Sequence, residues 1–438
     1  NMSVNKGYLK IFFLLLISNN IHAADLVDVY NRAIQYNDDY RIIKNDREIS
    51  LQQYNQTAAS IFPEINLQAG TRETTINKYI GPGDNTNFNT DSYSLTLQQP
   101  IFRLAFFDEL AKSDAVIKRS EKYLTLQKKR IALKTTELYF RLISNTNNLR
   151  EKKELLKLSE KKLNNAHKLY SNGSITKTEF LKYKSNVESS RIARDMAMNE
   201  QENSSGDLYV FVGKKISDIH NVNTEIEITN NQYELTDVLN QATSKYEIIQ
   251  MANYDLDISQ NIFESNKSQH FPRIDLIASY DYSDVTGGAR FGANKTESSS
   301  VGLTLTLPIY QGGYQSAKVK ESRYKLENAQ IKYEQTLKIL EKEVADKISK
   351  HSIQKGLVNN QREIYKLYNL KYISAKEGFR AGVYTDTELQ QSKIELIQAK
   401  NSFVDATLNF ILLDLDIKQY TSQIGIDEIK EINSILVW

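Results

Sequence analysis

The sequence predicts a chain of mixed α and β structure, in which two copies of one unit each combine a pair of strands with a long antiparallel helical hairpin. Three observations predict this fold class. Short motifs recur at a constant distance, all 5 prolines lie in two short windows, and four segments alternate between apolar and polar residues. The unit is far longer than the roughly 20–50 residues of a solenoid repeat, so two internal structural repeats are expected.

The duplication sets the expected domain boundaries. Three pairs of equivalent residues are separated by 209, 208 and 209 positions, namely Pro63 and Pro272, Pro100 and Pro308, and Gly173 and Gly382. A spacing held over such a distance indicates two copies of one large unit. We expect a first repeat over residues 24–219, a second over 229–425 and a C-terminal tail over 426–438.

Residues 1–23 have the layout of a secretory signal peptide. Lys6 and Lys10 precede an apolar run, and Ala23 ends the segment with a small residue suited to cleavage. The apolar run is far shorter than the ~20 residues that a membrane-spanning helix needs, which disfavours a membrane anchor. Because the sequence contains no cysteine, we expect an exported chain without disulfides or thiol-linked lipid.

Four segments are expected to be strands, at about residues 64–72, 91–100, 273–283 and 300–308. Apolar residues alternate in them with Asn, Gln, Ser, Thr, Gly or Asp, so one face is apolar and the other polar. About ten residues suit a strand that crosses a bilayer, and Tyr93 and Tyr280 near the strand ends suit an interfacial belt. A half-buried sheet in a soluble domain would alternate in the same way and stays open as an alternative.

The remainder predicts long helices, at about residues 103–205 and 312–418. No proline interrupts these stretches, and proline is the residue that breaks a helix interior. Each stretch contains one corner at which a glycine precedes a Thr-x-x-Glu capping box: Gly173 before Thr176 to Glu179, and Gly382 before Thr385 to Glu388. Each helical run is therefore expected to fold back into an antiparallel hairpin with a tight tip.

With strands at one end and paired helices at the other, the layout resembles the TolC family of outer membrane channel proteins. The resemblance is carried by the leading helix Leu26–Ala33, the Phe-Pro strand starts, the segment Leu307–Gly313 and the two glycine tips. It implies a homotrimer in which each chain gives four strands to a 12-stranded transmembrane β-barrel and its helices to an α-barrel tunnel. Physical reasoning also requires an oligomer, because four strands cannot close a barrel and an open sheet edge in lipid leaves backbone groups unpaired.

The resemblance further implies passive export through the outer membrane, with a large periplasmic portion in a Gram-negative envelope. The chain would be the exit duct of tripartite efflux pumps or type I secretion systems, in contact with outer membrane lipid. A periplasmic adaptor protein and an inner-membrane pump or transporter, which supplies the energy, are the implied partners. Adaptor docking is then expected at the hairpin tips, at Gly173, Ser174, Gly382 and Val383.

The resemblance places a pore constriction at Glu388 and Gln391, which match two family aspartates three residues apart. Residues i and i+3 share one helix face, so both side chains would point into the pore. The alternative is that Glu388 folds back onto the backbone N–H of Thr385 as a helix cap. A side chain used in that way cannot also reach the pore axis.

Family members also lock the closed mouth with side-chain bonds between the two hairpins. The matching positions in this chain are Thr178, Glu179, Phe379 and Tyr384. Tyr384 stands where a typical member has arginine, and Phe379 where it has tyrosine. A phenol offers one neutral hydrogen bond, so we expect either a weaker lock or one made by other residues.

The sequence disfavours several other classes of function. The 5 histidines are scattered without metal-ligand spacing, so we expect no metal, no cofactor and no catalytic residues. The net charge of +2 comes from 56 basic and 54 acidic residues that are interspersed, so no basic face for nucleic acid is expected. A periplasmic coiled-coil adaptor or stalk protein without a pore is the rival, but it has no use for four alternating strands.

Overall fold

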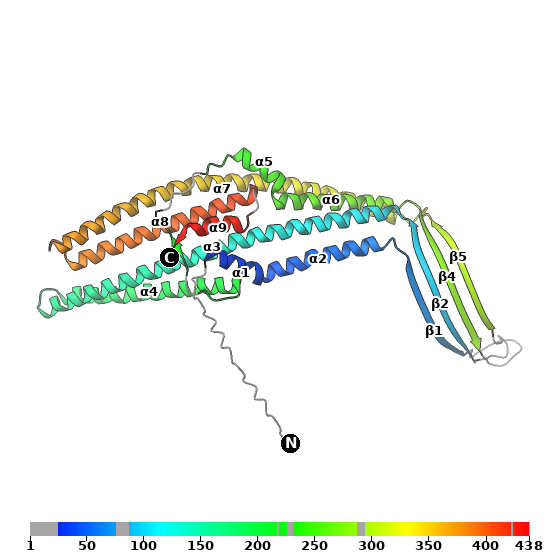
Figure 1. The fold of residues 1–438 in the computed structure, drawn as a ribbon, viewed down its shortest axis with the longest axis horizontal. Helices are drawn as coiled ribbons and strands as arrows, with labels where there is room; N and C mark the ends of the chain where they lie inside the picture. Colours follow the sequence, from blue (N-terminus) through cyan, green and yellow to red (C-terminus); the bar gives the residue numbers. More distant parts are fainter. Residues whose placement is uncertain are drawn as a thin grey trace, which may run out of the picture.

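The computed structural model describes residues 25–75, 87–216, 219–225, 231–286, 294–421 and 424–437. The expected signal peptide at 1–23 lies outside them. The molecule is elongated, with long helices that run from the hairpin tips at one end to a four-stranded sheet at the other (Figure 1). This arrangement confirms the predicted fold class of long helical hairpins joined to a strand domain.

The two repeats contribute the same succession of elements. The first comprises α1 (Leu26–Tyr36), α2 (Asp38–Ala59), β1 (Glu64–Thr75), β2 (Asn87–Phe102), α3 (Leu104–Ser171), α4 (Lys177–Val212) and β3 (Asn221–Val222). The second comprises α5 (Leu235–Lys245), α6 (Glu247–Ser268), β4 (Arg273–Thr286), β5 (Asn294–Thr306), α7 (Tyr314–Arg380) and α8 (Asp386–Thr421), followed by α9 (Ile426–Ser434) and β6 (Leu436–Val437). In both repeats, two short helices lead into a strand hairpin and then into a long helical hairpin.

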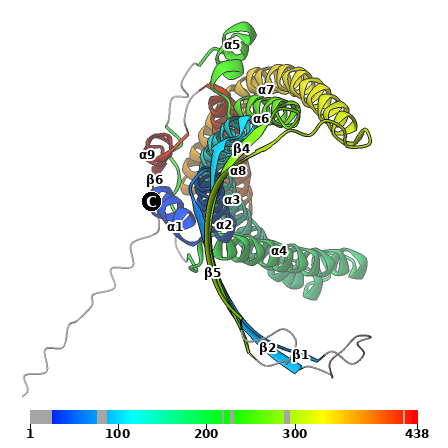
Figure 2. The same cartoon turned by 90° about the vertical axis from the view of Figure 1, so that its right-hand side faces the viewer.

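The four long strands form one antiparallel sheet in the order β1-β2-β4-β5. Each strand is longer than the expected ten residues, with 12 to 16 residues per strand. The fourth strand also begins earlier than expected and ends at Thr306, because Pro308 cannot donate a ladder hydrogen bond. The sheet curves away from the helical axis, as Figure 2 shows from its end.

The first long helix, α3, extends over 68 residues, which corresponds to ~100 Å at 1.5 Å per residue. It contains neither proline nor glycine, so no residue in its interior breaks the hydrogen-bond ladder. The equivalent helix α7 extends over 67 residues. Helices α4 and α8 return along α3 and α7 respectively, and α3 also packs against α8. The two hairpins are therefore joined where α3 packs against α8.

The principal core lies where the two chain ends meet the middle of the long helices. Leu26, Val29, Tyr139, Leu208 and Ile429 are fully buried in this cluster. Residues 426–437 of the expected C-terminal tail contribute to this core. Helix α9 packs against α1, and β6 pairs with β3 of the first repeat. This helix has 9 residues, which is too short for its apolar periodicity to be recognised in the sequence.

The described helices contain no segment that is both long and apolar enough to cross a membrane. Within the same described ranges, no group of three or more His, Asp or Glu side chains is arranged to hold a metal ion.

Candidate functional site

The strand register collects the alternating apolar residues of all four strands on one face of the sheet. Leu95 pairs with Leu67 and Tyr280, and Leu276 pairs with Leu303. Because paired residues point to the same side, these side chains form one continuous apolar face. Many of them are exposed to solvent in the single chain, and Leu67, Leu303 and Val301 are 71%, 70% and 77% exposed. Such a contiguous apolar patch indicates an interaction with lipid or another apolar surface.

An aromatic cluster ends the apolar face on the side of the strand hairpins. The Tyr93 ring stacks on Tyr282 with centroids 4.5 Å apart, and on Tyr280 at 6.1 Å. Beyond this cluster the same face carries charged residues, including Asp284 and Lys295. From Ile274 to Tyr282 the apolar face extends for eight residues, or ~26 Å along the strand. Tilted by ~40°, a strand run of this length covers ~20 Å along the bilayer normal, close to the ~25 Å apolar band of outer membrane barrels.

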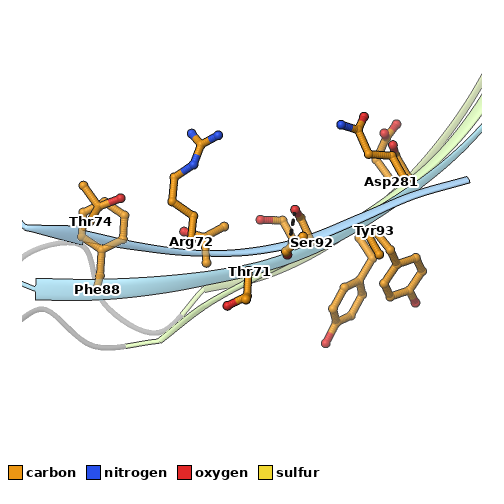
Figure 3. A pocket seen from close by; sticks show the side chains of 14 residues that line it. Thr71, Arg72, Thr74, Phe88, Ser92, Tyr93 and Asp281 are labelled. Carbon is orange, nitrogen blue, oxygen red and sulfur yellow. Dashed lines mark hydrogen bonds between the residues drawn. The ribbon is translucent and has the colours of Figure 1, made fainter.

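The opposite face of the sheet is mostly polar, although it also carries Phe88, Ile277 and Val285. Figure 3 shows Arg72, Ser92 and Asp281 on one side of the strands, with Thr71 and Tyr93 on the other. A hollow over the polar face is lined mostly by residues with this orientation. The sheet therefore separates an apolar surface from a polar one, which is the division that the wall of an aqueous channel requires.

The two hairpin tips are built alike. Gly173 and Gly382 both adopt left-handed conformations, with φ of 73° and 75°. The residues after them, Ser174 and Val383, donate backbone hydrogen bonds of 2.8 Å to Leu169 and Gly378. These bonds satisfy carbonyls at the helix ends in the manner of a Schellman motif, which favours glycine at the left-handed position. The tips predicted for docking are thus short and held by backbone bonds.

Both tips continue into a complete capping box. The Glu388 carboxylate accepts hydrogen bonds from the Thr385 backbone N–H at 2.7 Å and from its hydroxyl at 2.8 Å. Glu179 accepts the equivalent bonds from Thr176 at 2.9 and 3.1 Å. The bonds from the threonine backbones, and then those from the hydroxyls, lower the pKa of both carboxyls. The cap that we weighed against the pore constriction is therefore formed at Glu388.

Gln391 is half-buried and contacts the first hairpin. Its side-chain oxygen accepts a hydrogen bond from Lys162 on α3 at 3.2 Å, and its amide donates to Glu395 at 3.4 Å. Glu395 in turn pairs with Lys371 on α7 at 2.5 Å. That pair, followed by the bond from Gln391, lowers the pKa of Glu395 despite partial burial. Both predicted constriction residues thus have partners within one chain, and a ring across three chains stays a prediction.

The structure does not bring the four expected lock residues together. Among the residues described, no hydrogen bond or ring contact joins Thr178 or Glu179 to Phe379 or Tyr384. Tyr384 instead lies on its own hairpin, where a Cβ on Gly378 would come within 2.2 Å of its ring. Phe379 and Tyr384 are both partly exposed, at 41% and 44%. A lock made by these four residues stays a prediction for the assembled protein.

A row of polar contacts between α3 and α8 joins the hairpins instead, and we call it the α3–α8 seam. Near the tips, Lys161 forms an ion pair with Asp386, and Lys393 pairs with Glu154 at 2.9 Å. Further along, Asn401 donates to Glu151 at 3.0 Å and Ser144 to Asp405 at 2.5 Å. Sequence reasoning missed these residues. The sequence has 110 interspersed basic and acidic residues, and nothing in it marks which of them form pairs. The pairs become apparent only when the fold places α8 beside α3.

Comparisons with known proteins agree with this geometry. The family model described as Outer membrane efflux protein matches residues 238–412. Outer membrane protein TolC of Escherichia coli is 20% identical over 423 residues, which cover 94% of this chain and 85% of that protein. The alkaline protease secretion protein AprF of Pseudomonas aeruginosa is 19% identical over 412 residues, covering 91% of this chain and 84% of that protein.

Solved structures show the same fold. The Campylobacter jejuni CmeC outer membrane channel superposes with a TM-score of 0.73 at 15% identity, covering 99% of this chain and 97% of that one. The open state of the Neisseria gonorrhoeae MtrE outer membrane channel gives a TM-score of 0.65 at 15% identity, covering 92% and 91%. At these identities the likeness shows the fold alone.

Proposed function

We propose, because the chain belongs to the outer membrane efflux protein family, that it is the outer membrane exit duct of tripartite efflux pumps or type I secretion systems. The family is one of transport channels, so the duct is passive. The protein resides in the outer membrane, and its helices form the periplasmic tunnel. The cargo leaves the cell through the polar interior.

The observation that carries this function is the two-faced sheet with two open edges. Strands β1 and β5 each pair with one neighbour, so their outer edges have no strand partner among the described residues. A bilayer leaves such an edge unsatisfied unless strands from other chains close the sheet. Three copies of four strands give the 12-stranded barrel that the family resemblance implies. The homotrimer is therefore our proposal for the working assembly.

The rival interpretation is a periplasmic adaptor or stalk protein that forms no pore. It accounts for the long helices equally well. It gives no function to the ~26 Å apolar face and its tyrosine cluster. In a periplasmic protein that face would be exposed to water, where an apolar sheet promotes aggregation. The channel therefore accounts for more of the molecule.

The hairpin tips are the surfaces that we propose for the periplasmic adaptor, through Gly173, Ser174, Gly382 and Val383. Val383 is 75% exposed, and no other segment of the described chain covers it. An inner-membrane pump or transporter would then be coupled through the adaptor and would supply the energy. No step of this function calls for a catalytic residue or a bound cofactor in the duct.

The periplasmic mouth is proposed to narrow at Glu388 and Gln391. In the single chain these side chains bond to Thr385 and Lys162, so a ring at the axis requires that they exchange those partners. We further propose that the α3–α8 seam holds the second hairpin against the first. Opening of the mouth would then break the Lys161–Asp386 and Glu154–Lys393 pairs before it breaks the apolar contacts deeper in the tunnel.

The test combines the mass of the detergent-solubilised protein with its conductance in a planar bilayer. We expect a trimer that conducts ions without any energy source. A monomer that conducts would contradict the shared barrel. A stable trimer that never conducts, together with recovery from the periplasm instead of the outer membrane, would support the stalk interpretation.

A further inference from the structure

The polar face of the sheet carries few charges, and two of them, Arg72 and Arg273, have no ion pair or hydrogen bond to any described residue. Within the described strands, the charged residues with this orientation are Glu64, Arg72, Arg273, Asp275 and Asp281. Asp275 is buried and paired with Arg103 at 2.7 Å. Asp281 and Glu64 accept hydrogen bonds from Ser279 and Asn66 respectively. Arg72 is exposed and has no ion pair or hydrogen bond to any described residue.

Arg72 lies toward the strand hairpins, at the far end of the sheet from the helices. It pairs with Thr90, whereas Asp281 lies on the level of Ser94 and Gln68. Four residues along β1 separate the two levels, which is ~13 Å. Figure 3 shows both side chains on the same side of the sheet, with the Arg72 guanidinium directed away from the strands. A basic level and an acidic level thus follow each other along one polar surface.

We propose that three copies of Arg72 form a cationic ring in the lumen of the barrel, which binds multivalent inorganic anions and favours anionic cargo near the exit. This inference rests on the proposed trimeric channel. Twelve strands spaced ~4.8 Å apart and tilted by ~40° form a barrel with a radius of ~12 Å. An extended arginine side chain reaches roughly 6 Å from its Cα, from the lengths of its bonds. The three guanidinium groups would then lie ~6 Å from the axis and ~10 Å from one another.

At this separation the ring acts as a unit. The Debye length at physiological ionic strength is ~8 Å, so an ion at the axis lies within one Debye length of all three charges. Walls of low dielectric in the membrane strengthen this field further. Guanidinium groups also bind phosphate oxygens with paired N–H donors, which favours oxyanions over halides. The ring therefore distinguishes anions by both charge and geometry.

The test uses Arg72→Gln and Arg72→Glu channels in planar bilayers, with inorganic triphosphate as the probe. Under a KCl gradient, the reversal potential of Arg72→Gln should move toward cation preference, and that of Arg72→Glu should move further. Block by triphosphate should weaken at least about tenfold in Arg72→Gln, since charge-assisted bonds to the anion are lost. The matched control is Lys295→Gln, because Lys295 lies one register level from Arg72 but on the apolar face.

Two results would overturn the ring. One is an Arg72→Gln channel that conducts with the original reversal potential and triphosphate block. The other is a shift of equal size in Lys295→Gln, which would assign the effect to general surface charge. Wild-type protein that forms no trimer or no channel would instead overturn the proposed function, so the two failures are distinguishable.

Discussion

The tips of the two helical hairpins have the same backbone structure, but they differ in the residue that begins the returning helix. Both have a left-handed glycine, the same pair of backbone bonds and a complete capping box. Among the described residues, the returning helix of the second hairpin begins with Asp386, which forms an ion pair across the α3–α8 seam, and that of the first does not begin with such a residue. At the equivalent position in the first tip stands Lys177, which forms no ion pair with any described residue.

The interiors of the tips differ as well. In the first, Tyr170 stacks on Phe180 with centroids 5.1 Å apart. In the second, the Tyr384 ring occupies the space that a side chain on Gly378 would need, where the first copy has Leu169. Duplication thus kept the residues that turn the chain and changed those that decide what each tip contacts. This difference supports the proposal that the second hairpin closes the mouth.

The largest effect that we predict concerns the strands, where the two copies should behave alike. Leu95→Arg and the equivalent Leu303→Arg each place a charge on the apolar face. Each should cost about 2–4 kcal/mol near the bilayer midplane, measured by urea unfolding of the protein in lipid vesicles. Thr96→Arg and Thr304→Arg, on the polar face, are the matched controls and should cost far less. Equal losses on both faces would contradict the assigned orientation of the sheet.

The next effect tests the packing that belongs to the second tip alone. Gly378→Ala should destabilise the tip by about 1 kcal/mol, because overpacking against Tyr384 costs about 1–3 kcal/mol and the gain in helix propensity returns only part of it. In a Tyr384→Ala background the same change should stabilise the tip by about 0.5–1 kcal/mol. Hydrogen exchange of the tip amides measures both. A stabilising Gly378→Ala with Tyr384 intact would show that the ring does not occupy this space.

These two cases also show what the sequence could predict. Alternation with period two and its recurrence in both copies predicted the apolar face residue by residue, and the register places Ile65, Leu97, Ala278 and Val301 together. A face of a strand is a local property, so one sequence suffices for it. Glycine followed by Thr-x-x-Glu is likewise local and predicted both tips.

Contacts between helices were beyond this reasoning. The partner of Asp386 is Lys161, on another helix and far away in sequence, and nothing near either residue marks the pair. The sequence also did not reveal why position 378 is a glycine. The reason is the ring of Tyr384, six residues later, which folds back over Gly378. For Glu388 the sequence allowed two roles, a helix cap and a pore-lining residue, and could not decide between them. The cap is local and is formed, whereas the ring depends on three chains.

The third prediction tests the ion pair between Lys161 and Asp386, which joins the two hairpins. We expect a smaller effect on stability and a clear effect on conductance. Asp386→Lys gives the second tip the charge of the first and replaces attraction to Lys161 with repulsion. Since the pair is partly exposed, the loss should be at most about 1 kcal/mol. The free trimer should nevertheless conduct more, because the seam near the tips is weakened. Adding Lys161→Asp should restore the original conductance, and Lys177→Asp in the first tip should change it little. No change in Asp386→Lys would exclude a role for this pair in closure.

The smallest effect on stability should come from the two capping glutamates. Glu388→Gln and Glu179→Gln keep a capping side chain, so thermal unfolding at neutral pH should change little in either. The pKa of each carboxyl is lowered below its usual 4.5 by bonds from the threonine, so the charged cap stabilises the folded state above that value. Its contribution is lost as the pH falls through the lowered pKa, and the glutamine variants should lack this acid-dependent loss.

Conductance then separates the two roles of Glu388, since only the second tip is proposed to line the mouth. If Glu388 leaves its cap to form a ring at the axis, Glu388→Gln should reduce cation preference and block by multivalent cations, while Glu179→Gln leaves both unchanged. Three like charges at the axis concentrate cations, and neutral amides do not. If both variants keep the original selectivity and block, Glu388 is only a helix cap, as Glu179 is in the first tip. The constriction must then be made by other residues.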